Sequence, residues 1–179
     1  METLEQLEKR VWWDYLGEDL QKLIKSSEFI YHEVKSWGVD LPGGSQEFDD
    51  FSFVVFPAAK AYEGFLKKLF LDMKFISEED YFGKHFRIGK ALNPSLPKEL
   101  EKESVYVKVV EYCKGRNLAD KLWETWKYSR NLTFHWFPNE KNALTLSEAG
   151  QRMEMIIDAI DSSFEGCRIE DKKSHNVAK

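Results

Sequence analysis

KYSRNLTFHWF, residues 127–137, ends a long apolar helical pattern and carries an arginine, an asparagine and a histidine. Pro138 follows directly, and a proline ends a helix because its nitrogen has no hydrogen to donate. The sequence therefore predicts a helix over 118–137, with three polar side chains at its C-terminal end. Its apolar face is formed near helical spacing by Leu118, Leu122, Trp123, Trp126 and Tyr128.

Helical geometry determines which of the polar side chains share a face. Asn131 and His135 are four residues apart, so a regular helix places them on one face. Arg130 and His135 are five apart and diverge by roughly 140° at 3.6 residues per turn. We expect that only the long side chain of Arg130 can close this gap.

An ordinary structural role accounts for Arg130 and His135 equally well. Cations near the end of a helix bond its last carbonyl groups and interact favourably with the helix dipole, by about 0.3–1 kcal/mol each. Helix capping therefore stays open beside a functional role for the two side chains.

Length and composition predict one soluble domain. A chain of 179 residues, 42% hydrophobic and 15% aromatic, can bury a sizeable core. A secretory signal begins with basic residues that are followed by an apolar run. The first residues of this chain are acidic instead, so we expect no secretory signal. The longest apolar run, residues 51–59, is too short to cross a bilayer and contains Pro57. These features predict a cytoplasmic protein that does not enter the membrane.

Cysteine and charge usage narrow the class further. Cys113 and Cys167 lack zinc-ligand spacing, so we expect two thiols, no metal site and no cofactor. The net charge of −5 is unfavourable for nucleic-acid binding by the chain as a whole. Phosphate contacts depend on local clusters of lysine and arginine, however, and such clusters occur within 60–74 and 84–90.

Apolar periodicity predicts an all-α fold. Helical spacing covers residues 2–16, 20–34, 57–73, 118–137 and 147–164, and the valine-rich segment 99–113 is a helix of modest propensity. Residues 51–55 are strand-like in composition. We interpret them as helix, because no second run of comparable strength exists to pair with them.

A long basic loop is predicted between the central helices, over residues 76–97. The segment has little apolar periodicity and contains two glycines and two prolines. Within it, FGKHFRIGK at 82–90 alternates aromatic with basic residues, which suits the stacking of bases and the neutralisation of phosphates. Lys84 and Arg87 are the candidates for this contact. A solvated loop held by its own apolar residues is the alternative.

Glu63 lies within the helix predicted over 57–73. Lys67 follows four residues later, and a glutamate–lysine pair at this spacing is an ordinary exposed pair worth about 0.3–0.5 kcal/mol. Gly64 costs the helix about 1 kcal/mol relative to alanine, which indicates that another element packs closely here. Spacing alone favours the ordinary pair.

Two motifs resemble those of HEPN domains, a helical family of RNA-cleaving toxins and effectors. Arg130-Asn-Leu-Thr-Phe-His135 is similar to the R-x4-6-H signature of that family, including the polar residue after the arginine. Ala61-Tyr-Glu-Gly-Phe-Leu-Lys-Lys-Leu69 is similar to the A-x-E-G-[FL]-x-K segment of the RNase LS toxins RnlA and LsoA, which precedes their arginine–histidine helix. The likeness spans roughly residues 58–164.

The resemblance implies an HEPN-like helical bundle with the basic loop between its central helices. It divides the chain into an N-terminal helical extension over 1–50, an HEPN-like domain over 51–168 and a tail over 169–179. We expect the tail to be disordered, because it is charged and has no apolar stripe.

The resemblance also implies a metal-independent endoribonuclease toxin of a toxin–antitoxin or anti-phage module. In the family, the 2′-hydroxyl of RNA attacks the adjacent phosphate and leaves a 2′,3′-cyclic phosphate. The implied catalytic residues are Arg130 to hold the phosphate, His135 to transfer protons and Glu63 to orient either of them. The RNA-binding or positioning residues that we expect are Asn131, Lys67, Lys84, Arg87 and Lys127.

The implied partners are RNA, a second copy of the chain and an antitoxin. HEPN domains pair two copies across one shared site, so we expect a homodimer. Some HEPN toxins carry a tyrosine two residues after the histidine, which their antitoxin modifies, whereas Phe137 has no hydroxyl to modify. A protein antitoxin is therefore expected. The aromatic residues available for the dimer interface or for the core are Trp123, Trp126, Phe134 and Trp136.

Two alternatives stand beside the ribonuclease. One is a non-catalytic HEPN domain that binds a nucleotide or a protein partner. The other is a helical module with no chemistry. Retention of the glutamate, arginine, asparagine and histidine together favours the enzyme.

Overall fold

Helices form the regular structure of this protein. The computed structural model describes residues 3–38, 48–138 and 142–165, apart from the side chains of residues 98 and 101. Within these ranges there are helices and no β-sheet, so the predicted all-α fold is confirmed. The tail predicted over 169–179 lies outside the described residues.

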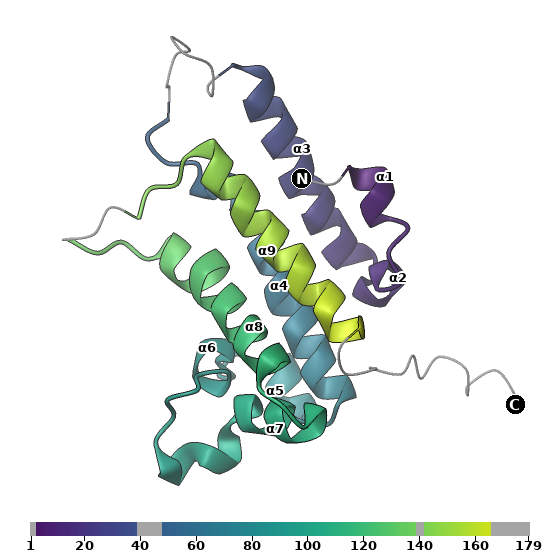
Figure 1. Cartoon of the computed structure of the whole chain (residues 1–179), viewed down its shortest axis with the longest axis vertical. Coiled ribbons are helices and arrows are strands. Elements are labelled where there is room, and N and C mark those ends of the chain that lie inside the picture. Colours follow the sequence, from purple (N-terminus) through teal and green to yellow (C-terminus); the bar gives the residue numbers. More distant parts are fainter. Residues whose placement is uncertain (1–2, 39–47, 139–141, 166–179) are drawn as a thin grey trace, which may run out of the picture.

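Long helices lie alongside one another, and shorter ones gather at one end of them (Figure 1). The long helices are α3 (Glu18–Ser36), α4 (Ser52–Asp72) and α9 (Leu146–Glu165), with α8 (Asn117–Trp126) beside α4 and α9. The short helices α5 (Glu78–Phe82), α6 (Ile88–Ala91) and α7 (Val105–Cys113) lie at the lower end in Figure 1, and α1 (Leu4–Leu7) and α2 (Trp13–Leu16) lie near α3.

The central helix is α4, which begins at Ser52 and so confirms the helical interpretation of residues 51–55. Ten of its 21 residues are buried, because α3, α9 and the segment after α8 all pack against it. Gly64 lies where α3 approaches most closely. A Cβ at that position would be 2.6 Å from a methyl group of Leu20, which confirms that another element packs closely on this glycine.

Pro57 lies inside α4 and is accommodated by a side chain from α3. The amide of Ala58 donates to the hydroxyl of Ser27 at 2.8 Å, and that hydroxyl donates to the carbonyl of Val54 at 2.8 Å. The fully buried Ser27 thus bridges a donor and an acceptor that a regular helix would join directly. This bridge fixes α3 against α4 near the turn that carries Glu63.

The described residues of the predicted extension contribute to the same core as the rest of the bundle. Trp12 is fully buried, and its indole nitrogen donates to Asp161 on α9 at 2.5 Å. Trp13, Leu16 and Val34 belong to one continuous apolar cluster with residues of α4 and α9. The predicted extension therefore packs as part of the bundle.

The helix predicted over 118–137 is wrong at its C-terminal end. α8 ends at Trp126, a π-helical turn covers Lys127–Asn131, and a 3₁₀ turn covers Leu132–Phe134. The hydroxyl of Thr133 donates to the carbonyl of Tyr128 at 2.6 Å and so takes an acceptor that the regular ladder would use. His135 has extended backbone, with φ −106° and ψ 132°. The angles between side chains in a regular α-helix therefore do not describe how Arg130, Asn131 and His135 are oriented.

The basic segment over 76–97 has more helix than the sequence predicts. α5 is capped by Ser77, whose hydroxyl accepts from the amide of Asp80 at 3.1 Å, and α6 follows five residues after α5 ends. Lys84 and Arg87 lie in the connection between them and are exposed. The predicted loop is thus two short helices joined by a basic turn.

Two further expectations concern cysteine and the membrane. Cys113 at the end of α7 is disulfide-bonded, so the expected thiol is wrong at this position, and Cys167 lies outside the described residues. Across the ranges that the structure describes, no helix has the length and apolar character needed to traverse a lipid bilayer.

Candidate functional site

The structure brings Glu63 and Arg130 together from two distant segments. The carboxylate Oε2 of Glu63 on α4 lies 3.5 Å from Nε of Arg130 on the π-helical turn. The two side chains are 36% and 30% exposed, so the pair lies at the surface of the bundle within reach of a ligand. The motifs identified separately around these residues thus meet in the fold.

The ordinary partner of Glu63 does not take part in this contact. Lys67 lies one turn further along α4 and is half-buried, and within the described ranges it forms no ion pair with Glu63. The ion pair of Glu63 therefore joins two helical segments, whereas a pair with Lys67 would lie on the surface of one helix. The spacing of residues along α4 predicted the wrong partner, because it contains no information about side chains of other helices.

The guanidinium of Arg130 lies between two aromatic rings. Its Cζ is 5.8 Å from the ring centre of Trp126 and 5.5 Å from that of Phe134. Nε is buried, yet it has no hydrogen-bond partner in the part of the chain that the structure describes. The contact with Glu63 is thus an attraction between charges at 3.5 Å rather than an aligned hydrogen bond. The aromatic rings and the carboxylate hold the guanidinium in place.

Helix capping by Arg130 or His135 is not what the structure shows. Among the described residues, neither side chain donates a hydrogen bond to a helical carbonyl. Arg130 also lies within the π turn, before the last turn of the segment. The two cations therefore do not serve as the conventional end of a regular helix.

His135 is close to the pair in sequence, but among the described residues its side chain forms no hydrogen bond or ion pair with it. The residue is exposed, and the side chain of Asn142 donates to its backbone carbonyl at 3.3 Å. Its ring lies 6.2 Å from the ring of Phe137. Within the described residues the imidazole has no hydrogen bond or ion pair to Glu63 or Arg130. One protomer therefore does not assemble all three implied catalytic groups.

Two of the predicted positioning residues, Asn131 and Lys127, lie on the same π-helical turn as Arg130. Asn131 is half-buried on the π turn, directly after Arg130. Lys127 begins the same turn, and its ammonium lies 5.1 Å from the ring centre of Tyr128. π-helical turns occur often at functional sites, because the extra residue turns side chains away from the regular ladder. The motif is therefore carried by a specialised turn.

Trp126 links the pair to the basic segment, and the sequence did not single it out for this. A Cβ at Gly89 on α6 would be 2.8 Å from the indole nitrogen of Trp126, so α6 packs directly on that ring. The guanidinium of Arg130 also lies near this ring, with Cζ 5.8 Å from its centre. The sequence feature that points to this contact is Gly89, because a glycine within a segment indicates that another group approaches closely. Arg130 and the basic segment thus share one aromatic neighbour.

Tyr62 fixes α8 against α4 beside Glu63. Its hydroxyl donates to the carbonyl of Leu122 at 3.1 Å, and the side chain is fully buried. Burial raises the pKa of this phenol well above its usual value, and a hydrogen bond with Thr125 offsets part of that rise. Tyr62 therefore stays protonated and serves as a structural donor, where the sequence suggested only an apolar position.

The aromatic residues offered for an interface divide between the core and the surface. Trp126 is buried, whereas Trp123 and Phe134 are partly buried against the core. Trp136, next to His135, is 82% exposed. Of these four, only Trp136 presents most of its ring to a partner.

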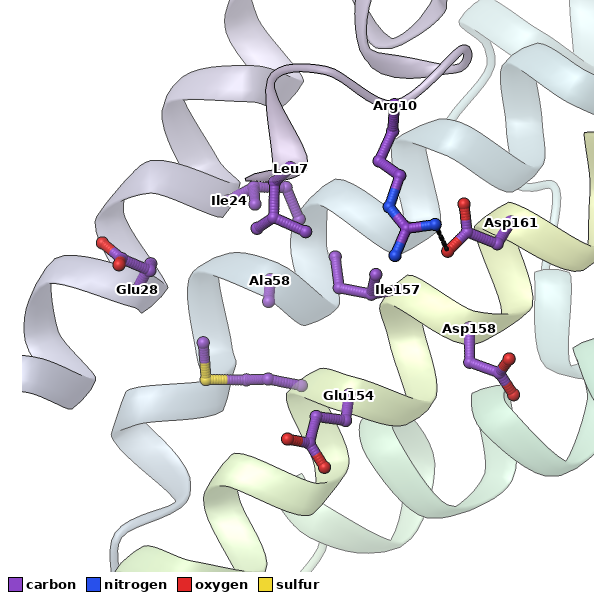
Figure 2. A pocket seen from close by; sticks show the side chains of 10 residues that line it. Leu7, Arg10, Ile24, Glu28, Ala58, Glu154, Ile157, Asp158 and Asp161 are labelled. Carbon is purple, nitrogen blue, oxygen red and sulfur yellow. Dashed lines mark ion pairs between the residues drawn. The ribbon is translucent and has the colours of Figure 1, made fainter. Parts of the chain in front are cut away.

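An acidic pocket of about 250 Å³ lies between α1, α3, α4 and α9 (Figure 2). Its walls include Leu7, Ile24 and Ala58, and carboxylates surround them. Arg10 reaches into this acidic surround and pairs with Asp161 at 3.5 Å. Excess negative charge repels phosphate, so this pocket does not suit RNA. Nor does any group of three or more histidine, cysteine, aspartate or glutamate side chains within the described ranges have the arrangement of a metal site.

Comparison with known proteins gives no match to a family model, to a curated protein or to a solved structure. The HEPN resemblance therefore stays a prediction that depends on the two motifs and on the residues in them.

Proposed function

We propose that this protein is a metal-independent endoribonuclease of the HEPN type, acting as the toxin of a toxin–antitoxin or anti-phage module. The observation that carries the proposal is the 3.5 Å contact between Glu63 and Arg130. Each residue belongs to a different motif of the resemblance. An ordinary surface pair between Glu63 and Lys67 would not bring the two motifs together. The contact between Glu63 and Arg130 does, which favours a shared role for the two motifs.

Arg130 supplies the positive charge in this mechanism. Its planar guanidinium donates parallel hydrogen bonds to two phosphate oxygens and stays charged at any working pH. Negative charge on the phosphate increases as the 2′-oxygen adds to phosphorus, so the cation stabilises the transition state more than the ground state. Glu63 and the two aromatic rings hold the guanidinium in position. Because Glu63 also repels phosphate, RNA binding depends on further cations.

His135 transfers the proton. An imidazole accepts the proton of the 2′-hydroxyl near neutral pH, the 2′-oxygen bonds to phosphorus, and the bond to the 5′-oxygen breaks. The departing 5′-oxygen takes up a proton, and a 2′,3′-cyclic phosphate remains. His135 is exposed on an extended segment, which leaves its ring accessible to RNA. Two copies of the chain facing one another supply two arginines and two histidines to one composite site.

The separation of His135 from the pair favours a second function. Because the imidazole does not contact Glu63 or Arg130 within the described residues, the pair also suits a domain that binds RNA or a nucleotide without cleaving it. The two functions differ in one outcome, since only the enzyme produces new RNA ends.

The proposal extends to partners and compartment. A protein antitoxin that covers Arg130 suits a site whose neighbouring Phe137 offers no hydroxyl for modification. The RNA substrate places the activity in the cytoplasm. Disulfides are uncommon there, so the bond at Cys113 makes reducing conditions a necessary comparison in every assay.

Cleavage of RNA in EDTA tests the proposal. Purified protein, with and without reductant, is incubated with a mixed RNA pool, and the products are examined for 2′,3′-cyclic phosphate ends. We expect cleavage by the wild type and none by Arg130→Ala at equal concentration. Equal cleavage by both proteins would assign the activity to another site or to a contaminant.

A further inference from the structure

A second pocket lies against the basic segment, away from the acidic pocket of Figure 2. Its volume is about 420 Å³, within the range of roughly 300–1,000 Å³ that is common for small-molecule sites. Basic and aromatic side chains meet in it. The residues that matter here are Phe75, Phe86, Arg87, Lys102 and His85.

Positive charge is in excess among the described side chains of this pocket. Four permanent cations line it, against the two carboxylates of Asp80 and Glu103. Both carboxylates are already engaged. Asp80 accepts from the backbone amide and the hydroxyl of Ser77 at the start of α5, at 3.1 and 2.8 Å, and Glu103 pairs with Lys90 at 2.8 Å.

Two of the cations have no partner in the described part of the chain. The side chains of Arg87 and Lys102 form no ion pair or hydrogen bond there, and both residues are exposed. Lys108, by contrast, donates to the carbonyl of Phe75 at 2.7 Å. Arg87 and Lys102 are therefore available to an anion, and a guanidinium with an ammonium is a combination that suits phosphate.

Aromatic rings give the pocket a second kind of wall. Phe75 and Phe86 are both partly buried, and the ring of Phe75 is fixed edge-on against Tyr112 at 6.0 Å. Bases stack favourably on such rings, whatever their sequence. Inorganic phosphate would use only the cations, whereas a nucleotide would use both walls.

We propose that this pocket binds one nucleotide, with its phosphate between Arg87 and Lys102 and its base against the aromatic wall. The nucleotide is either free or a unit of an RNA strand, since both present the same chemistry. The inference goes beyond the cleavage site and does not need it. The pocket is connected to the proposed cleavage site through α6. This helix lines the pocket with Lys90 and Ala91, and its Gly89 packs on Trp126, whose ring also lies near Arg130.

Calorimetric titration with 5′-AMP, a six-nucleotide single-stranded RNA and inorganic phosphate tests the pocket. We expect AMP to bind the wild type, and Arg87→Gln and Lys102→Gln each to weaken it by about tenfold or more. Lys114→Gln is the matched control, because Lys114 is an exposed lysine directly after α7 and does not line the pocket. It should change AMP binding by less than about twofold.

Further variants and ligands in the same titration distinguish a nucleotide site from a simple phosphate site. Phe86→Leu should weaken AMP and leave inorganic phosphate unchanged. RNA binding without AMP binding, with the same losses in the two variants, still supports a nucleotide site and assigns it to the RNA strand. Equal binding of AMP and inorganic phosphate, an equal loss in Lys114→Gln, or no binding of any ligand would overturn the proposal. AMP binding and its loss in Arg87→Gln and Lys102→Gln are measured without any RNA cleavage, so failure of the cleavage mechanism is distinguishable from failure of this pocket.

Discussion

The carboxylate of Glu63 on α4 lies 3.5 Å from Nε of Arg130 on the π-helical turn that follows α8. The contact joins two segments that pack on one another in the bundle, and it leaves the guanidinium without a hydrogen bond in the described part of the chain. A purely structural ion pair gains most when its hydrogen bonds are formed. An arginine that is held by charge and by two rings, with no hydrogen bond among the described residues, supports the phosphate-binding role that we propose for it.

Replacement of His135 by alanine should abolish RNA cleavage without loss of the fold. The side chain is exposed and makes no hydrogen bond among the described residues, so the free energy of unfolding should change by less than about 0.5 kcal/mol. Cleavage rates and urea unfolding curves are measured on the same preparation. His32→Ala is the matched control, since His32 is also exposed and lies on α3. Cleavage by His135→Ala at the wild-type rate would remove the imidazole from the mechanism.

Ser27→Ala should lower the free energy of unfolding by about 1–3 kcal/mol, the usual cost of leaving buried polar groups unpaired. The substitution removes the hydroxyl that bridges Val54 and Ala58 at Pro57. Ser26→Ala provides the comparison, because Ser26 is exposed and bonds only to Lys22 within its own helix. Urea unfolding of the two variants should therefore differ clearly, and equal stability would show that the bridge contributes nothing.

The chain should form a symmetric homodimer with the Arg130–His135 segments near its axis. Trp136 is 82% exposed beside His135, and exposed tryptophans are frequent anchors of interfaces. Light scattering at micromolar concentration should give the mass of two chains. Trp136→Ser should raise the dissociation constant by about tenfold or more, whereas Phe82→Ser, at a ring that is 79% exposed on α5, should not. A monomer in every buffer would exclude the composite site.

The class of fold was predictable because it depends on local periodicity. The apolar stripe of α4 and the absence of paired strand-like runs fixed the all-α assignment, and Gly64 correctly indicated the approach of α3. The end of α8 was not predictable in the same way. There the hydroxyl of Thr133 competes with the helical ladder, and a π turn replaces the regular one. Propensity rules do not describe such competition.

The candidate site was predictable as a set of residues but not as a geometry. Motif spacing singled out Glu63 and Arg130, yet spacing assigned Glu63 to Lys67, because the true neighbour arrives from another element. Trp126 was predicted only as an apolar position, and its contacts with both Arg130 and Gly89 follow from tertiary packing. The extended backbone of His135, after the π and 3₁₀ turns, was not predictable from the spacing either.

The rate of RNA cleavage by Glu63→Gln, under single-turnover conditions, tests most directly whether the Glu63–Arg130 pair serves catalysis. The amide keeps the shape of the side chain but loses the charge that holds Arg130, so we expect the rate to fall by about a hundredfold or more. The pair is partly exposed, so the free energy of unfolding should fall by no more than about 1 kcal/mol. Lys67→Ala removes an expected RNA-binding side chain that forms no ion pair with Glu63 among the described residues. With protein in saturating excess over RNA, it should therefore cleave at the wild-type rate. Equal rates for the wild type and Glu63→Gln would contradict the account and leave the pair a structural contact.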